Sequence, residues 1–433
     1  MTQATGQSRL RRTLQFAAVT CVFANLIACG SSSDQSSANV TETGGGRGTA
    51  GSSAVDSMPN VLPIRVNGGP SAAATLFVNS LYADVTVCIP GTSNCQTIAD
   101  VLVDTGSSGL RLLASEVTLT LPSVNDSTGN RLGECIVFAD TSYLWGSIAK
   151  ADVQLASEKA FSVPIQIVEP AGFPHVPSAC GATGPADSTV DVLGAHGILG
   201  VGLFRQDCGA ACAANNGPNG TPDVYFGCPN ASATSSCTAV AVPIGNQVQN
   251  PVSLMSEDNN GVLLSLPAIS DQGAPTVSGS LVFGIGTRSN NALGSATVYS
   301  ADDYGHIATT FNGVTYTGIN GSYIDSGTNM LVVPAPSTTT LPVCSDASPF
   351  YCPQATQSYT ATNLGHNGTR GQVTFNVANA DALVGTNNTA FNDLAGESGN
   401  TLAWGLPFFF GRNIFVAIER ANTPAQAGPY WAY

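Results

Sequence analysis

The sequence predicts an all-β protein, and three features of its 433 residues support that prediction. Short apolar runs alternate with turn residues, and the chain contains 47 glycines and 25 prolines that favour tight turns. Long amphipathic helical patterns are scarce, and charged residues make up only 10% of the chain. Such a composition is typical of many short strands joined by turns. The hydrophobic content of 43% is enough for two separate cores.

The N-terminal segment has the pattern of an export signal. Residues 9–29 begin with three arginines, continue through an apolar stretch and end in Leu26-Ile-Ala-Cys29. A basic head, an apolar middle and small final residues are typical of secretory signals. The last four residues look like a bacterial lipobox, so we expect residues 1–28 to be a lipoprotein signal peptide and Cys29 to carry the lipid. A plain signal peptide cut nearby is the alternative.

Residues 29–60 are rich in Ser, Gly, Thr and Ala, which predicts a flexible tether. We therefore expect a protein of the bacterial cell envelope that contacts the membrane only through its N-terminal lipid. Gly30, directly after the lipidated cysteine, favours the outer membrane, with the protein on its periplasmic or surface face.

The first half of the remaining chain, residues 61–285, leads into an acidic turn. Strands are expected over four segments: Val61–Val66, Leu76–Val78, Tyr82–Ile89 and Gln96–Val103. The last of these runs straight into Asp104, and a Gly-Ser-Ser-Gly turn follows. Burial of a carboxylate costs several kcal/mol unless a partner compensates it, so a lone Asp here would be a poor choice for stability.

The second half, residues 286–433, repeats this order of strands and acidic turn. Strands are expected over Ala296–Tyr299, His306–Phe311 and Val314–Tyr316, with an Asn-Gly hairpin turn between the last two. An apolar residue again precedes the acid, Asp325, and Ser326-Gly-Thr328 follows it.

Two Asp-hydroxyl-Gly-hydroxyl turns, one in each half, predict a pair of carboxylates that act together. Two carboxylates about 3 Å apart cannot both ionise, so they share a proton. One can act as base on a water while the other acts as acid on a carbonyl oxygen. Each motif could instead be a simple Asx turn, but the matching apolar flanks favour the dyad. The residues expected to support Asp104 and Asp325 are Thr105, Gly106, Ser107, Ser326, Gly327 and Thr328.

These turns and the segments around them resemble the pepsin-like aspartic protease family. Three further segments carry the resemblance: Ile198-Leu-Gly200, Gly279–Gly284, and Trp404–Phe408 followed by Ile414–Asn422. The match spans most of residues 61–433. It implies two double-psi β-barrel lobes related by a pseudo-twofold axis, with Asp104 and Asp325 as catalytic residues in the cleft between them. It also implies that no cofactor is needed.

The resemblance is weaker at the hairpin that closes over substrate in this family. Residues 138–155 occupy its place, and either Phe138 or Tyr143 could stand for the usual flap tyrosine. Arg111 occupies the position of the tryptophan that supports that tyrosine. Tyr143 could equally pack on the barrel without touching substrate.

Ten cysteines remain after Cys21 and Cys29 are set aside, and an exported protein is expected to oxidise them. Cys88 and Cys95 flank a turn, and Cys344 and Cys352 are close in sequence, so both pairs predict local disulfides. Four others fall in an insertion-like region, residues 205–260, where disulfides are favoured over a metal site: Cys208, Cys212, Cys228 and Cys237. The last two disulfide candidates are Cys135 and Cys180.

The charge and the remaining motifs narrow the function classes. A net charge of −14 does not suit a nucleic-acid partner. The four histidines are widely spaced and form no HExxH motif, so no metal is expected. We expect a monomeric aspartic endopeptidase acting on polypeptides. The alternatives are a catalytically silent lipoprotein that binds a peptide or glycan on the same fold, and a surface adhesion module.

Overall fold

The computed structural model describes residues 58–169, 173, 175–213, 223–229, 237–335, 341–345, 349–397 and 401–433. The predicted signal peptide, Cys29 and nearly all of the predicted tether lie outside these residues. Strands account for 42% of these described residues and helices for 10%, which confirms the all-β class.

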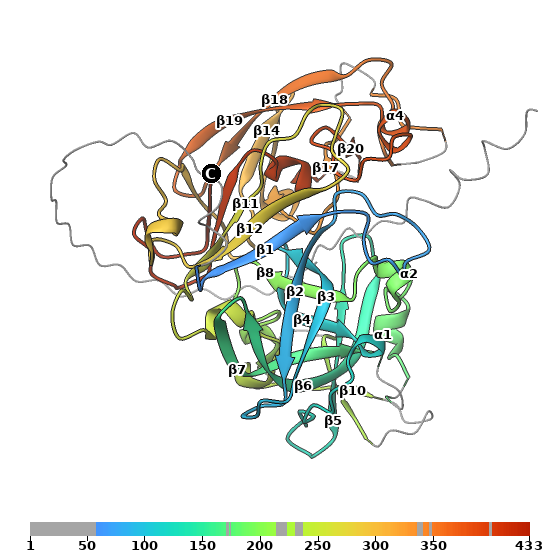
Figure 1. Cartoon of the computed structure of the whole chain (residues 1–433), viewed down its shortest axis with the longest axis vertical. Helices are drawn as coiled ribbons and strands as arrows, with labels where there is room; N and C mark the ends of the chain where they lie inside the picture. The colour runs from blue at the N-terminus through green and yellow to red at the C-terminus, as the bar shows by residue number, and fades with distance from the viewer. Residues whose placement is uncertain are drawn as a thin grey trace, which may run out of the picture.

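Six strands of the N-terminal half close into a β-barrel (Figure 1). They are β2 (Leu81–Cys88), β3 (Cys95–Asp104), β4 (Ser108–Leu113), β6 (Tyr143–Leu155), β7 (Glu158–Val168) and β8 (Gly197–Val201). The ring runs β2-β3-β8-β4-β7-β6, and a second pairing of β6 with β2 closes it. Within it β3 and β8 are parallel, β8 and β4 antiparallel, and β4 and β7 parallel.

Four short strands of the C-terminal half repeat that pairing. They are β16 (Tyr323–Ile324), β17 (Leu331–Val332), β20 (Ala395–Gly396) and β21 (Ala403–Trp404). In the order β16-β21-β17-β20 the three pairings are again parallel, antiparallel and parallel. Asp104 ends the first strand of one set, and Asp325 directly follows the first strand of the other. The two acidic turns therefore occupy equivalent places in two copies of one topology.

The barrel sheet continues into strands that link the two halves. Beyond β2 it adds β1 (Val61–Val66), β12 (Val277–Phe283), β11 (Gly261–Ser265), β22 (Asn413–Ala417), β23 (Tyr430–Ala432) and β13 (Val298–Ser300). Beyond β6 it adds β5 (Arg131–Val137), β9 (Tyr225–Cys228) and β10 (Thr238–Ala239). In Figure 1, β1, β11 and β12 lie between the barrel below and the C-terminal strands above.

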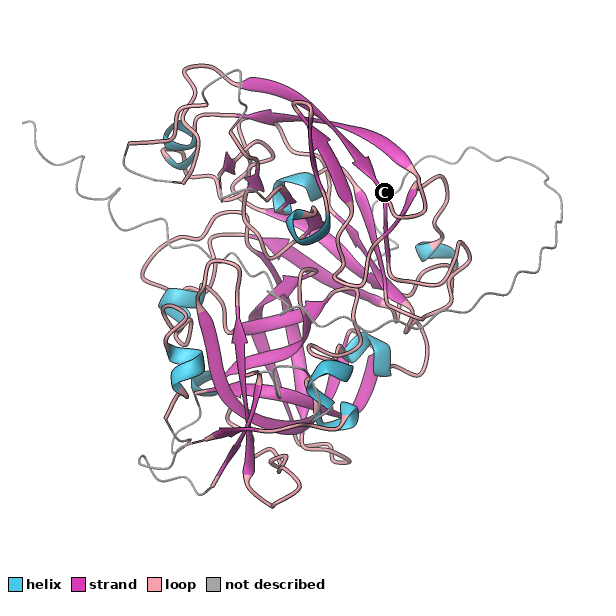
Figure 2. Ribbon diagram, turned by 180° about the vertical axis from the view of Figure 1, so that it is seen from behind, coloured by secondary structure: helices cyan, strands magenta, loops and turns pink. Residues whose placement is uncertain are grey.

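A separate four-stranded sheet and short helices complete the fold. The sheet contains β14 (Ala308–Phe311), β15 (Val314–Tyr316), β18 (Gln357–Leu364) and β19 (Arg370–Val377). The α-helices are α1 (Ser178–Gly181), α2 (Val190–Leu193), α3 (Ala210–Ala213) and α4 (Ala380–Val384). The 3₁₀ helices are η3 (Ala114–Glu116), η4 (Ile244–Asn246), η5 (Pro251–Leu254), η6 (Ser289–Asn291), η7 (Gly318–Asn320) and η8 (Leu406–Phe409). Figure 2 shows how small the helical part is beside the strands.

The largest hydrophobic core contains side chains from both halves of the chain, from Leu62 to Trp431. The apolar residues before each acidic turn, Val103 and Ile324, belong to it. No helix in the described part of the chain is long and apolar enough to span a bilayer.

Two expected elements differ from the structure. Residues 76–78 form no strand: Leu76 is exposed, and the segment runs as a loop past Gly68, where Phe77 N–H bonds to the Gly68 carbonyl at 3.1 Å. The turn of the hairpin expected within residues 138–155 lies at the start of that segment, at residues 138–142. There β5 ends at Val137, and β6 starts at Tyr143 and pairs with it. Its turn is closed by the Phe138 N–H, which donates to the Ser142 carbonyl at 2.8 Å.

Candidate active site

The two acidic turns meet, and reciprocal hydrogen bonds join them. Thr105 Oγ1 donates to the Ile324 carbonyl at 3.0 Å and accepts from the Ser326 N–H at 2.9 Å. Ser326 Oγ donates to the Val103 carbonyl at 2.8 Å and accepts from the Thr105 N–H at 3.1 Å. Both hydroxyl side chains are buried, so each bond is shielded from competition with water.

Each carboxyl group is also held by its own turn. The Gly106 N–H donates to Asp104 Oδ1 at 2.8 Å, and the Gly327 N–H donates to Asp325 Oδ1 at 2.8 Å. A hydroxyl three residues after each acid donates to the second oxygen: Ser107 Oγ to Asp104, and Thr328 Oγ1 to Asp325 at 2.7 Å. The two turns thus satisfy their carboxyl groups in the same way.

The glycines let the two acids approach each other. A Cβ at Gly106 would lie 2.7 Å from Asp325 Cγ, and one at Gly327 would lie 2.7 Å from Asp104 Oδ1. Any side chain at either position would clash with the opposite carboxyl group. The requirement for glycine therefore comes from the dyad itself rather than from backbone conformation.

The two carboxyl groups hydrogen-bond to each other, and both are fully buried. Burial, and then the negative charge of Asp104, raise the pKa of Asp325 well above its usual range. Burial also raises the pKa of Asp104, but hydrogen bonds from Asp325 and Ser107 oppose that shift. The Arg111 cation also opposes the rise in the Asp104 pKa. Both pKa values are raised, so the pair holds one shared proton at pH values where an isolated Asp is ionised.

A cavity of about 40 Å³ opens beside the dyad turn. Its walls come from both halves of the chain and include Gly106, Phe204, Tyr304, His306 and Tyr323. Burial lowers the pKa of His306, which favours the neutral imidazole there. The cavity holds water-sized groups in this conformation.

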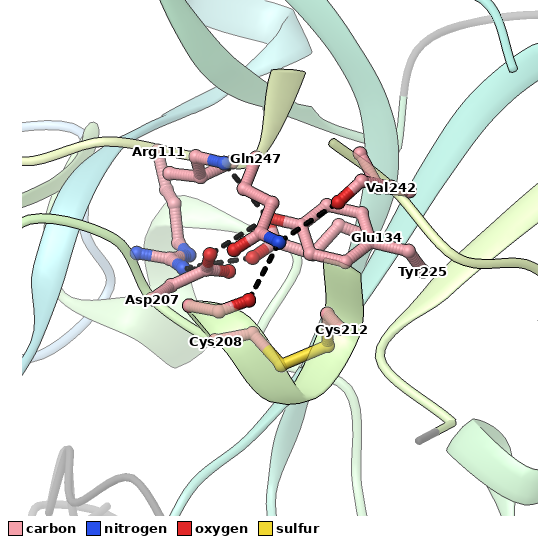
Figure 3. Close-up of a disulfide and its surroundings, with 10 residues drawn as sticks. Arg111, Glu134, Asp207, Cys208, Cys212, Tyr225, Val242 and Gln247 are labelled. Carbon is pink, nitrogen blue, oxygen red and sulfur yellow. Dashed lines mark hydrogen bonds and ion pairs between the residues drawn. A yellow bond between two sulfur atoms is a disulfide. The ribbon is translucent and has the colours of Figure 1, made fainter. Parts of the chain in front are cut away.

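Arg111 belongs to a buried charged cluster next to the dyad (Figure 3). Its Nη2 lies 2.8 Å from Glu134 Oε1 and 3.4 Å from Asp207 Oδ2. Its Nη1 donates to the Ser108 carbonyl at 2.9 Å, and so reaches the Asp104 turn. Tyr225 OH donates to Asp207 Oδ1 at 2.7 Å.

The charges of this cluster predict a bound proton. One guanidinium faces two carboxyl groups, all almost fully buried, and an unbalanced charge there is costly. Burial, and then the negative charge of Glu134, raise the pKa of Asp207 well above its usual range. A protonated Asp207 leaves Arg111 and Glu134 as a neutral ion pair.

The two flap candidates are buried away from the cavity beside the dyad. Phe138 packs with Leu102 and Ile198 in a core of the N-terminal half. Tyr143 packs with Trp145 around the Cys135–Cys180 disulfide. Neither side chain lines that cavity.

Residues 56–433 match a family described as "Protein of unknown function (DUF3443)". The chain belongs to the DUF3443 family. No curated protein matches it.

All ten candidate cysteines of this DUF3443 protein form disulfides. The two predicted local pairs, Cys88–Cys95 and Cys344–Cys352, are confirmed. The remaining bridges, which the sequence left open, are Cys135–Cys180, Cys208–Cys212 and Cys228–Cys237. Within the described residues, Cys344, Cys352 and Asp381 have metal-like spacing, but the two sulfurs are bonded to each other and are not available as thiolate ligands.

Sequence reasoning missed Glu134, Asp207 and Tyr225 in this DUF3443 protein. They lie 23, 96 and 114 residues after Arg111, and no local motif connects them. The only available signal was Arg111 itself, a cation in an apolar run that directly follows an acidic turn.

Proposed function

We propose that this DUF3443 protein is an aspartic endopeptidase with a pepsin-like fold. The observation that carries the proposal is the reciprocal pair of bonds between Thr105 and Ser326, which hold two buried carboxyl groups against each other. Such a pair costs stability, because two buried acids repel when both ionise. A catalytic role accounts for the presence of a pair that stability alone would not favour. Water activation between Asp104 and Asp325 is the chemistry that this arrangement suits best.

In the proposed mechanism the two acids have different roles. Asp104, the ionised partner, accepts a proton from a water whose oxygen attacks the peptide carbonyl carbon. Asp325 donates its proton to the carbonyl oxygen, and a neutral tetrahedral diol forms. Asp104 then transfers its new proton to the leaving nitrogen while Asp325 takes a proton back from a hydroxyl. The C–N bond breaks, and the dyad again holds one proton.

The proposed bilobal fold is supported by the repeated topology. The sets β3-β8-β4-β7 and β16-β21-β17-β20 share one pairing pattern, as a duplicated domain would. We place the N-terminal lobe at 61–285, with an insertion at about 205–260, and the C-terminal lobe at 286–433. Substrate polypeptide would lie between them, above the dyad.

We infer the location and partners from the N-terminal sequence. We propose cleavage after residue 28, a lipid on Cys29, and attachment of a monomer to the outer membrane by that lipid alone. The segment 29–60 would hold the catalytic part away from the bilayer.

Cleavage of a peptide library from acidic to neutral pH tests the proposal. The wild-type protein should cut, while Asp104→Asn and Asp325→Asn should each lose cleavage by at least about 1,000-fold because one carboxyl group cannot do both proton transfers. Asp84→Asn is the matched control, since that carboxylate is half exposed and pairs with Arg65 at the surface. Cleavage retained in both dyad variants would refute the mechanism.

A catalytically silent binding lipoprotein is the second candidate. It is favoured by the burial of Phe138 and Tyr143, which leaves neither flap candidate in the cavity beside the dyad. A folded wild-type protein that retains peptides or glycans without cutting any peptide would establish it.

A further inference from the structure

A second cavity, of about 140 Å³, lies in the C-terminal half and shares no lining residue with the cavity at the dyad. Strands β17 and β19, helix η8 and the loops before β20 and β22 surround it. Its walls include Leu331, Phe375, Asn392, Pro407, Phe408 and Arg412. A cavity of roughly 150 Å³ is known to accept a benzene-sized group.

Arg412 brings a positive charge to this cavity. Its Nη1 donates to the Phe408 carbonyl at 2.7 Å, and its guanidinium lies over the Phe408 ring at 4.4 Å. Within the described residues no carboxylate oxygen lies within ion-pair distance of this group, in a protein with net charge −14. Burial lowers the pKa of Arg412, so the environment disfavours its charge without an anion. The stacked guanidinium keeps donors for a planar anion.

Asn392 adds an acceptor without a partner. Its Nδ2 reaches the Ile269 carbonyl at 3.5 Å, while its buried Oδ1 accepts no hydrogen bond from the part of the chain that the structure describes. A buried acceptor without a donor is destabilising, because it has lost its hydrogen bonds to water. Asn392 lines the cavity, and rotation of its amide would turn this oxygen toward a ligand N–H or O–H.

We propose that this cavity binds the free C-terminus of a peptide whose last residue is aromatic or large and aliphatic. The carboxylate would pair with Arg412, the last amide N–H would donate to Asn392 Oδ1, and the side chain would pack on Phe375 and Pro407. A C-terminal aromatic or large aliphatic residue supplies the carboxylate, the amide N–H and the apolar side chain together. The site is independent of the proposed peptidase chemistry, and its test needs no cleavage.

Titration calorimetry of the full oxidised protein with N-acetyl-L-phenylalanine tests the proposal. Wild-type protein should bind it, and the C-terminal amide of the same compound should bind about 10- to 100-fold more weakly, the range for a hydrogen bond to a charged group. Arg412→Gln should show the same loss with the acid. Arg420→Gln is the control, because that side chain is 87% exposed and outside the cavity.

A second variant separates binding from folding. Asn392→Leu keeps the cation of Arg412. Its affinity for N-acetyl-L-phenylalanine should fall to the affinity that the wild type has for 3-phenylpropionate, a ligand without an amide N–H. Equal affinity of wild type and Arg412→Gln for the acid, or no binding by the wild type, would overturn the proposal. Inorganic phosphate that binds as tightly as the acid would overturn the peptide identity, since the apolar walls would then contribute nothing.

Discussion

Replacement of Thr105 by Val tests how the two halves of the chain are held together at the dyad. Valine keeps the shape of the side chain but removes Oγ1, which makes bonds of 3.0 Å to the Ile324 carbonyl and 2.9 Å to the Ser326 N–H. Both partners are buried and would be left without this bond. At about 1–3 kcal/mol for each unsatisfied buried group, the variant should lose about 2–6 kcal/mol of unfolding free energy. That is a large part of the ~5–15 kcal/mol typical of a folded protein.

Urea denaturation of the oxidised protein, followed by tryptophan fluorescence, measures this loss. Thr310→Val is the matched control: its hydroxyl contacts Thr315 on an exposed strand, and its removal should change stability by no more than about 0.5 kcal/mol. Ser326→Ala should resemble Thr105→Val, and the double variant should cost less than the sum because the two side chains support the same pair of turns. If Thr105→Val is as mild as the control, the reciprocal bonds do not join the halves and the reasoning is wrong.

Three further predictions follow from the same contacts. Asp207→Asn mimics the protonated acid at every pH. Because the pKa of Asp207 is raised in the folded protein, its protonated form stabilises the wild type at low pH, and this contribution is lost as pH rises. The unfolding free energy of the wild type minus that of the variant should therefore fall from pH 4 to 8. A difference that rises with pH would contradict the bound proton. Gly106→Ala should abolish cleavage and destabilise the fold, because its Cβ would lie 2.7 Å from Asp325 Cγ; normal activity in a peptide assay would refute the close approach. Replacement of Cys135 and Cys180 by Ser should cost about 4 kcal/mol, from the chain entropy of a 45-residue loop, and an unchanged urea midpoint would count against that bridge.

The sequence was most informative where the structural signal was local. The acidic turns could be found because each holds its own acid, glycine and hydroxyls within five residues, and because the pattern occurs twice. Cys88–Cys95 could be found because the two cysteines flank one turn. Most predicted strands agree within two residues, as for β1 and β15, because a period of two in apolar residues marks a half-buried strand.

Contacts between distant segments could not be predicted from one sequence. The Arg111 cluster joins β4 to Glu134 on β5 and to Asp207 in a loop, and only the folded barrel brings these three together. Residues 76–78 look like a strand because they are apolar, but tertiary contacts hold them in a loop. The Arg412 cavity likewise depends on the packing of four separate segments.

Binding of a transition-state mimic tests the central claim, that Asp104 and Asp325 act as one unit on a tetrahedral carbon. The ligand would be the best-cleaved peptide with a secondary alcohol in place of the scissile carbonyl, and its affinity would be measured by calorimetry. The account predicts that the wild type binds this alcohol at least about 100-fold more tightly than the parent peptide, and that Asp104→Asn and Asp325→Asn each lose that preference. Equal affinity for alcohol and parent peptide in all three proteins would contradict it.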